Sequence, residues 1–409
     1  MNMLYGLALR LYYAGVYLAS LCGNKKAAFW INGRRGLFEN LQKQLAKLDR
    51  PGPVYWFHCA SLGEFEQGRP LMEAHRNAEP DALIVLTFFS PSGFEVRKNY
   101  TGADIIAYLP LDTASNARRW LDSLKPDRVY FIKYEFWFNM LKELKTRETQ
   151  TFLVSAIFRP QQYFFKWYGR SAVRRLKAFS RIFVQDQNSQ QLLHALKIDS
   201  IVAGDTRFDR VSAIANDAKR IPLFEAFAQG QKLLVAGSTW LPDEQMLAAI
   251  GSLGMKLVIV PHEIGEAHLR ETEHLFASFK TARFSSLKIE DAPNYEVLIV
   301  DTIGMLSSIY RYASIAYIGG GFGAGIHNVL EAAVYGIPVI FGPRHEKFRE
   351  AIQLIACGGG FSFQTKEELA AIISQLTGST TSMQKACGAS ADYVQGNVGA
   401  VQIILNNLS

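Results

Sequence analysis

Short apolar runs alternate with longer stretches of helical or polar pattern along most of this 409-residue chain. The runs of the first half lie at 54–61, 82–89, 104–110, 128–135, 151–157, 180–186 and 200–205. After a stretch of weaker pattern, further runs lie at 232–239, 257–263, 297–302, 315–319 and 338–342. Strands that alternate with helices predict parallel, doubly wound sheets. Because one ordinary core cannot serve so long a chain, we expect two α/β domains.

The same pattern predicts the limits of these domains. The expected segments are an N-terminal hydrophobic segment (1–35), a first Rossmann-like domain (36–210), a linker (211–231), a second Rossmann-like domain (232–388) and a C-terminal helical segment (389–409). The helical pattern of the last segment is weak, and it suits packing against either domain.

A glycine-rich stretch in the second half shows the strand, loop, helix and strand order of a βαβ unit. Its glycine cluster lies at 319–325, and the pattern predicts a helix over 328–335. Glycines allow the backbone to approach a ligand, and a helix start attracts phosphate. His327, Asn328 and Glu331 stand beside this start, where they are suited to bind a ribose or a base. We therefore favour a nucleotide site over the alternative, a tight turn without a ligand.

Carboxylates follow two predicted strands of the first domain. Glu64 stands three residues after Ser61, the spacing of a helix capping box. Its functional alternative is a general base at the carboxyl end of a parallel strand, where open α/β sheets bind ligands. The pattern alone leaves both interpretations open. Glu135 lies among aromatic residues and needs a partner such as Lys133 or a ligand.

Polar residues also follow strands of the second domain. His262 and Glu263 come after the strand at 257–263, and Gly304 follows the strand at 297–302. A histidine beside a glutamate is usually ordinary surface chemistry. Several polar strand ends that converge on one glycine loop nevertheless favour a ligand site.

The N-terminal residues 3–22 are apolar and rich in tyrosine, with Arg10 in the middle. Twenty residues are enough to span a bilayer, but a central arginine costs about 2.5–3.5 kcal/mol on the insertion scale. The segment lacks the basic start and cleavage site of a secretory signal. Three interpretations stay open: a membrane anchor, a helix that lies in the membrane interface, and an ordinary buried helix.

The net charge of +7 is unevenly distributed along the chain. Residues 1–200 carry 28 basic and 17 acidic side chains, whereas residues 201–409 carry 16 and 20. An excess of basic residues beside a hydrophobic N-terminus favours an anionic membrane or a phosphorylated lipid as the binding partner. No nucleic-acid motif accompanies the charge, so we expect no nucleic-acid partner. The four cysteines are scattered without metal-ligand spacing, which predicts a reducing compartment and no structural metal.

Four motifs in this order resemble the bacterial 3-deoxy-D-manno-octulosonic acid (Kdo) transferases, a family of GT-B glycosyltransferases. They are HCASLGEFEQGRPL (58–71), KYEFWFN (133–139), GDTRFD (204–209) and GGGFGAGIHNVLEAAVYGIPVIFGP (319–343). The resemblance covers nearly the whole chain. It implies two Rossmann-like domains that face each other across a cleft, with an N-terminal membrane-associated helix and the donor nucleotide in the second domain.

The resemblance also implies an activity without a cofactor. Kdo would pass with inversion from CMP-Kdo to the lipid A precursor, lipid IVA, in lipopolysaccharide core biosynthesis on the cytoplasmic side of the inner membrane. Glu64 would be the general base, and Glu135 would orient the acceptor or the Kdo. The positions that match the donor contacts are Pro261, His262, Ile303, Gly304, Met305, Asn328, Val329, Leu330 and Glu331.

Two departures from the family pattern concern the donor site. Where many relatives have Arg-His, this chain has His262-Glu263, and where many have Gly-Glu-Leu it has Gly304-Met305-Leu306. The first departure removes a guanidinium, for which Arg344 or a basic residue of the first domain is a candidate replacement. Two alternatives follow: a GT-B transferase that uses a UDP-sugar on another lipid acceptor, and a nucleotide-binding membrane scaffold without catalysis. The presence of Glu64 and of the glycine loop argues against the scaffold.

Overall fold

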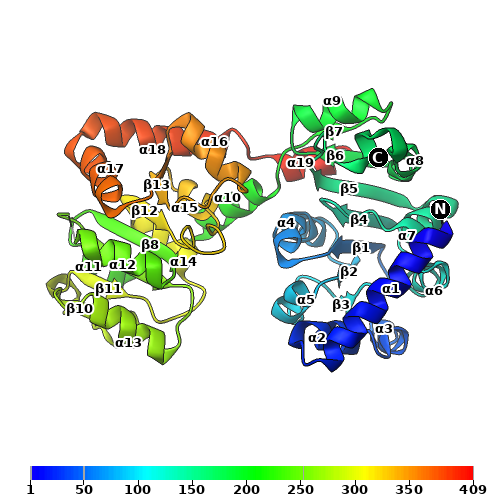
Figure 1. The fold of residues 1–409 in the computed structure, drawn as a ribbon, viewed down its shortest axis with the longest axis horizontal. Helices are drawn as coiled ribbons and strands as arrows, with labels where there is room; N and C mark the ends of the chain where they lie inside the picture. The colour runs from blue at the N-terminus through cyan, green and yellow to red at the C-terminus, as the bar shows by residue number, and fades with distance from the viewer. Residues whose placement is uncertain (1, 49–50, 252, 409) are drawn as a thin grey trace. The chain divides into compact units, whose positions relative to one another are not determined.

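The computed structural model describes residues 2–48, 51–251 and 253–408, which form two compact units (Figure 1). Unit 1 comprises Met1–Arg210 together with Gly399–Ser409, and unit 2 comprises Val211–Val398. Within the described residues, each unit contains one seven-stranded parallel sheet. Helices cover both faces of each sheet (Figure 1). The prediction of two parallel α/β domains is therefore confirmed.

The sheet of unit 1 has the strand order β3-β2-β1-β4-β5-β6-β7. Its strands are β1 (Val54–Cys59), β2 (Leu83–Phe88), β3 (Ile105–Tyr108), β4 (Arg128–Ile132), β5 (Gln150–Ala156), β6 (Arg181–Val184) and β7 (Ile201–Val202). Its helices are α1 (Asn2–Leu21), α2 (Lys25–Asn32), α3 (Leu37–Leu45), α4 (Leu62–Ala78), α5 (Pro91–Arg97), α6 (Ala114–Leu124), α7 (Phe138–Thr146), α8 (Arg170–Leu176), α9 (Gln187–Ala195) and α19 (Ala400–Leu405). The strand order reverses between β1 and β4, and ligands bind at this position in open α/β sheets.

The core of unit 1 forms because successive residues of a strand point to opposite faces of the sheet. In β1, Trp56 packs into the cluster beneath α3, α6 and α7, while Phe57 packs into the cluster beneath α4 and α19. Both side chains are fully buried. Burial on both faces explains why these strands read as continuous apolar runs instead of alternating ones.

The sheet of unit 2 has the strand order β10-β11-β9-β8-β12-β13-β14. Its strands are β8 (Leu233–Thr239), β9 (Lys256–Pro261), β10 (Thr281–Arg283), β11 (Val297–Ile299), β12 (Ile315–Ile318), β13 (Val339–Phe341) and β14 (Gly360–Ser362). Its helices are α11 (Pro222–Ala228), α12 (Leu241–Ile250), α13 (Glu266–Leu275), α14 (Leu306–Ile309), α15 (Leu330–Ala333), α16 (Arg349–Cys357), α17 (Lys366–Gly378) and α18 (Thr380–Gln395). Helix α10 (Arg207–Asp217) begins in unit 1 and ends in unit 2. Here the order reverses between β8 and β12.

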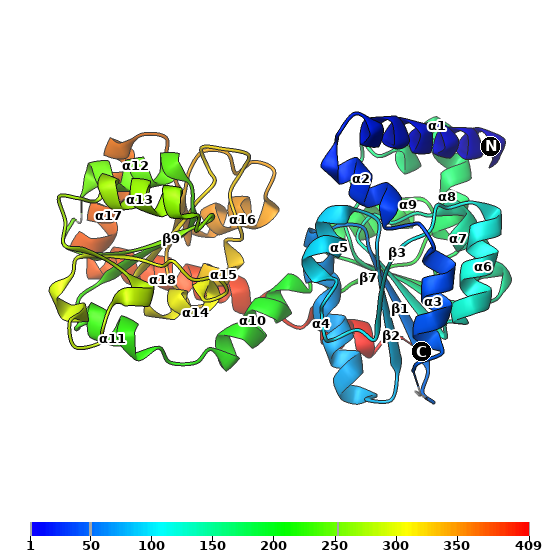
Figure 2. The same ribbon diagram turned by 90° about the horizontal axis from the view of Figure 1, so that it is seen from below.

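Helix α1 lies across the edge of unit 1 at which the strands end (Figure 2). The Tyr5 hydroxyl donates a hydrogen bond of 2.7 Å to Asp112, which follows β3. The Tyr5 ring lies 4.3 Å from that of Phe138, between centroids, and Tyr12 stacks on Phe89, the residue after β2. These contacts fix α1 beside the loops that follow β2, β3 and β4.

The other side of α1 is apolar and exposed. Leu7, Leu11, Leu18 and Leu21 recur at helical spacing and are all more than half exposed. The interpretation of this segment as an ordinary buried helix is therefore wrong. Among the helices of the described residues, none has the combination of length and apolarity that a membrane crossing requires.

Three of the predicted segments differ from the elements that the structure contains. The helix expected over 328–335 is reduced to the four residues of α15, which begins two residues later than expected and passes into a turn that ends at Gly336 (φ 65°). The segment 211–231, expected as a linker, contains the end of α10 and all of α11. The segment 389–409 is divided between α18, in unit 2, and α19, in unit 1.

Candidate functional site

Glu64 and Glu135 lie at the position where the strand order of unit 1 reverses. Glu64 is in the first turn of α4, which follows β1, and Glu135 follows β4. Both carboxyl groups are buried, with 9 % of each residue exposed. The fold thus brings together two carboxyl groups that are 71 residues apart in the sequence.

Glu64 is a carboxyl group with a strongly perturbed pKa. Burial, and secondarily the like charge of Glu135, raises the pKa of Glu64 to about 8. Its Oε2 atom accepts the backbone N–H of Ala60, so it does bind the helix start. The Ser61 side chain makes no capping hydrogen bond, however, and the reciprocal capping box is not formed. A carboxylate that is costly to ionise is a strong base once it is ionised, which suits it to accept a proton.

Glu135 is held by two aromatic side chains, His58 and Trp137, for which the sequence predicted no role. Its Oε2 atom lies 3.1 Å from Nε2 of His58 and accepts the Nε1–H of Trp137 at 2.5 Å. The other ring nitrogen of His58 lies 2.9 Å from Oγ1 of Thr87, which also accepts the Nε1–H of Trp56. These bonds fix the orientation of the Glu135 carboxyl group from inside the core. His58 is the first residue of the motif HCASLGEFEQGRPL (58–71). Its place in that motif was the one feature of the sequence that could have indicated a role for it.

Backbone geometry at the end of β4 also orients Glu135. Lys133 has a left-handed backbone (φ 68°), which is uncommon for a residue other than glycine and occurs often at functional sites. The Lys133 charge partly opposes the increase in the pKa of Glu64. Lys133 therefore acts electrostatically on Glu64.

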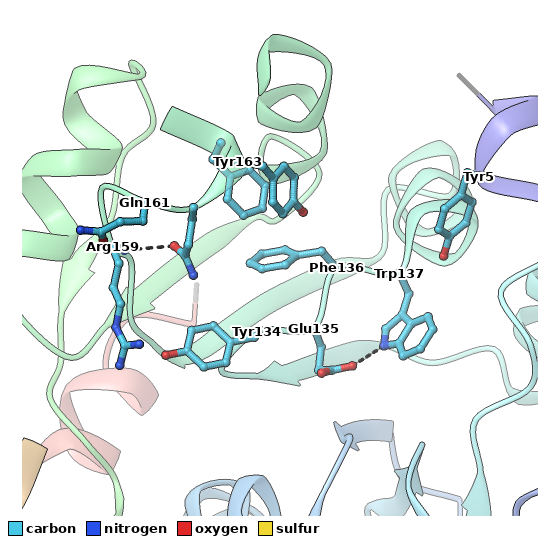
Figure 3. A pocket seen from close by; sticks show the side chains of 10 residues that line it. Tyr5, Tyr134, Glu135, Phe136, Trp137, Arg159, Gln161 and Tyr163 are labelled. Atoms are coloured by element: carbon cyan, nitrogen blue, oxygen red, sulfur yellow. Dashed lines mark hydrogen bonds between the residues drawn. The ribbon is translucent and has the colours of Figure 1, made fainter. Parts of the chain in front are cut away.

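A cavity of about 820 Å³ opens beside Glu135 (Figure 3). Aromatic rings form most of its wall, and polar groups are placed around them. The lining residues are Tyr5, Tyr134, Glu135, Phe136, Trp137, Arg159, Gln161, Gln162, Tyr163 and Phe164. Such a mixture of flat apolar faces and few polar groups is typical of a pocket for an organic ligand.

The GDTRFD segment is fastened to α4 one turn beyond Glu64. The Gln67 amide donates to both carboxylate oxygens of Asp205 at 3.1 Å, and Thr206 donates to the backbone carbonyl of Gln67. Asp205 is buried, which alone would raise its pKa, but the adjacent Arg207 guanidinium at 2.8 Å holds that pKa below its usual value. The Arg207 cation is thereby fixed close to the helix that carries Glu64.

The glycine loop of unit 2 follows β12, where the strand order of this unit reverses. A Cβ atom at Gly321 would lie 2.5 Å from the Cα atom of Gly342, so the two backbone segments approach too closely for a side chain. The buried Asp243 accepts the N–H of Gly320 at 2.9 Å and the Tyr317 hydroxyl at 2.8 Å. Arg344 donates to the carbonyl of Gly323. The loop is therefore rigidly built, with a cation beside it.

Three aromatic rings form a stack next to this loop. His262 lies between Trp240 and His327, at centroid distances of 4.6 Å and 4.5 Å. Trp240 donates its Nε1–H to Nε2 of His327 at 3.3 Å. Burial, together with the neighbouring His262, lowers the pKa of His327 to about 4, so this ring is neutral and accepts that bond. Both faces of the His262 ring are therefore covered by aromatic neighbours.

The other residues predicted to bind the donor differ in whether their side chains or only their backbone groups are available to a ligand. Asn328 donates to Glu331 at 3.0 Å and accepts the N–H of Leu330, so it organises the start of α15. The side chains of Val329 and Leu330 are fully buried, which leaves only their backbone for a ligand. Since α15 has only one turn, its dipole contributes little to phosphate binding.

The remaining predicted donor residues lie in two loops at the ends of strands. Pro261 ends β9 and is buried. Ile303 is 84 % exposed, and Gly304 has a left-handed backbone (φ 88°). Met305 precedes α14, and its sulfur accepts the Thr302 hydroxyl at 3.0 Å.

Comparison with known proteins gives a consistent result. A family model described as 3-deoxy-D-manno-octulosonic-acid transferase (kdotransferase) matches residues 32–210. The chain is 28 % identical to the 3-deoxy-D-manno-octulosonic acid transferase of Aquifex aeolicus, over 78 % of this chain and 85 % of that protein. The enzyme of the same name from Bordetella pertussis is also 28 % identical, over 84 % and 86 %, and that of Chlamydia trachomatis is 29 % identical, over 71 % and 70 %.

Solved structures show the same fold at low sequence identity. The UDP-GlcNAc 2-epimerase of Neisseria meningitidis matches 87 % of this chain and 98 % of its own, with a TM-score of 0.59 and 14 % identity. MurG of Acinetobacter baumannii matches 87 % and 99 %, with a TM-score of 0.54 and 14 % identity. These structures show the fold alone, whereas the family model and the sequence relatives show that the chain is similar to the 3-deoxy-D-manno-octulosonic acid transferases and is a glycosyltransferase enzyme.

Proposed function

We propose that this protein transfers Kdo from CMP-Kdo to the lipid A precursor, lipid IVA, in lipopolysaccharide biosynthesis. The observation that supports it most is the buried Glu64, whose pKa burial and Glu135 raise to about 8, at the reversal of strand order in unit 1. The choice of Kdo as the sugar follows from the similarity to Kdo transferases. The choice of a general base follows from the position and the pKa of Glu64.

In this mechanism Glu64 takes the proton from the 6′-hydroxyl of the acceptor glucosamine disaccharide. The hydroxyl oxygen attacks the anomeric carbon of Kdo, the bond from that carbon to the CMP phosphate oxygen breaks, and CMP leaves with the bonding electrons. The configuration inverts because attack and departure occur on opposite faces. The aromatic cavity beside Glu135 is suited to hold the acceptor, since sugar rings pack well on flat apolar faces.

The donor is assigned to the glycine loop of unit 2. The Trp240–His262–His327 stack offers an aromatic face for the cytosine, and Arg344 and the loop backbone are placed to meet the phosphate. Asn328 and Glu331, which bind each other at 3.0 Å, present polar groups for the ribose. No protein-bound metal is part of this proposal.

The proposed cellular location is the cytoplasmic face of the inner membrane. The exposed leucine stripe of α1 lies on the helix that contacts the loops after β2, β3 and β4, next to the candidate acceptor cavity. An amphipathic helix with such a stripe lies in the membrane interface. A lipid acceptor would then reach the cavity from the membrane surface.

The test is transfer of Kdo from CMP-Kdo to purified lipid IVA, followed by mass spectrometry, with Glu64→Gln as the variant. We expect the variant to lose transfer by about 10²–10⁴-fold, the typical contribution of a general base. Its folding control is urea unfolding at pH 8. Because a carboxyl group with a raised folded-state pKa destabilises the fold as pH rises from about 4.5 to 8, the variant should be at least as stable as the wild type there. A fully active Glu64→Gln would exclude the proposed base, and wild-type protein that bound CMP but made no product would exclude the acceptor.

A further inference from the structure

A second cavity, of about 490 Å³, lies between α1 and the helices α6 and α7 of unit 1. It is separate from the aromatic cavity beside Glu135, with which it shares no lining residue. Its apolar part is formed by Gly6, Leu9 and Tyr13 of α1, with Leu111 and Ala114. The proposed transfer reaction uses none of these residues.

Three cations from three different helices surround this apolar floor: Arg10 of α1, Arg118 of α6 and Lys142 of α7. All three side chains are exposed. Within the described part of the chain, none of these three side chains has a hydrogen-bond or ion-pair partner. Cations gathered in this way repel one another. An anionic ligand would therefore reduce the electrostatic repulsion among them.

The two acidic residues of the cavity are already occupied. Asp112 accepts the Tyr5 hydroxyl at 2.7 Å and the backbone N–H groups of Asn139 and Met140 at 2.9 and 2.8 Å. Glu143 pairs with Arg147 at 3.0 Å. These contacts hold both carboxyl groups in place, and the three cations still outnumber the two carboxylates that line the cavity.

The position of Arg10 connects this cavity to the exposed stripe of α1. Arg10 follows Leu7 by three residues and precedes Leu11 by one, so it lies on the flank of the stripe. A side chain in that position extends toward the level of lipid headgroups when the leucines enter the apolar layer. Tyr13, on the same side of the helix, has the amphipathic ring that is enriched at this level.

We propose that this cavity binds the phosphate headgroup of an anionic membrane phospholipid, with Arg10, Arg118 and Lys142 as its ligands. The guanidinium groups suit phosphate oxygens through paired hydrogen bonds, and the lysine adds a point charge. The lipid chains would lie along the leucine stripe. This inference rests on the membrane location given under the proposed function, and it adds a specific headgroup site to it.

The experiment is sedimentation of the full-length protein with vesicles of phosphatidylcholine, with and without phosphatidylglycerol, at constant ionic strength. The test variant carries Arg10→Gln, Arg118→Gln and Lys142→Gln. The matched control carries Lys219→Gln, Lys288→Gln and Lys385→Gln, which removes the same charge from exposed positions of unit 2. Since each cation near an anionic surface contributes about 1 kcal/mol, we expect the test variant to bind phosphatidylglycerol vesicles about 100-fold more weakly. The control should stay within about threefold of the wild type.

Three results would overturn the proposal. One is an equal loss in test and control variants, which would mean diffuse attraction by net charge. Another is binding by the test variant as tight as that of the wild type. The last is release of the wild type by inorganic phosphate at constant ionic strength, which would assign the site to free phosphate. A second assay, Kdo transfer to detergent-dispersed acceptor, distinguishes the headgroup site from the proposed transfer reaction. A test variant that is active but no longer sediments with vesicles supports the headgroup site. An inactive wild type disproves the proposed transfer reaction and leaves the headgroup site unaffected.

Discussion

Replacing Glu135 by Gln should shift the pH dependence of transfer toward lower pH. The substitution keeps the size of the side chain and a carbonyl oxygen for the Trp137 N–H, but removes the charge next to Glu64. Burial and this charge together raise the pKa of Glu64 from 4.5 to about 8. If Glu64 is the general base, the acid side of the pH profile of kcat/KM reports its ionisation in the free enzyme.

The magnitude follows from the order of the two causes. The raised pKa corresponds to about 5 kcal/mol of unfavourable free energy for the ionised Glu64 side chain. Burial is the larger of the two causes, so the Glu135 charge contributes the smaller unfavourable part, on the order of 1 kcal/mol. The midpoint of the acid side should therefore move from near 8 to near 7, a change of about one pH unit.

The assay is kcat/KM for Kdo transfer between pH 6 and 9, an interval that brackets the pKa of Glu64 at about 8. Glu135→Gln also replaces the carboxylate that contacts His58 by a neutral amide, so the maximal rate is expected to fall. The position of the acid side is independent of that loss, and it is the quantity to compare. A midpoint that stayed in place, or moved to higher pH, would refute the electrostatic link between the two carboxyl groups.

Three further substitutions test other parts of the two sites. In His58→Gln the new side chain cannot reach Thr87 and Glu135 together, so the free energy of unfolding in urea should fall by about 1–2 kcal/mol. The decrease in kcat should be larger than the change in KM for the acceptor, and an unchanged kcat would contradict the positioning role. Gly321→Ala should destabilise by about 2–3 kcal/mol because its Cβ would meet the Gly342 backbone, whereas the control Gly323→Ala, whose nearest neighbour is 3.6 Å away, should unfold like the wild type. Asn328→Ala should weaken CMP binding about tenfold in calorimetry by releasing Glu331 and the Leu330 N–H, and unchanged affinity would remove Asn328 from the donor site.

The buried strands were predictable because they are apolar on both faces. The predicted runs at 54–61 and 315–319 correspond to β1 and β12 within two residues. The strands β10 and β14 escaped prediction because each is a three-residue edge strand, TAR or GFS, without a long apolar run. Edge strands of this length gain little from side-chain burial, so their sequence carries little signal.

The candidate site was predictable in its residues but not in its connections. Glu64 and Glu135 stood out as carboxylates after strands, and the structure places both where the strand order reverses. The role of His58 depends on its contact with Glu135, 77 residues away, and no local pattern encodes such a contact. The helix at 328–335 was overestimated because apolar residues such as Val334 suited a helical period, although Gly336 turns the chain at once.

The return of the chain to unit 1 makes unit 2 an insertion in the sequence of unit 1. Asp209, before the insertion, accepts the backbone N–H groups of Gly399 and Val401 at the start of α19. Ile404 and Leu408 then fill the core beneath β1 and β4. During synthesis, unit 2 therefore emerges whole from the ribosome before the last piece of unit 1 does. Until residues 399–408 arrive, the part of the core that Ile404 and Leu408 complete stays unfilled.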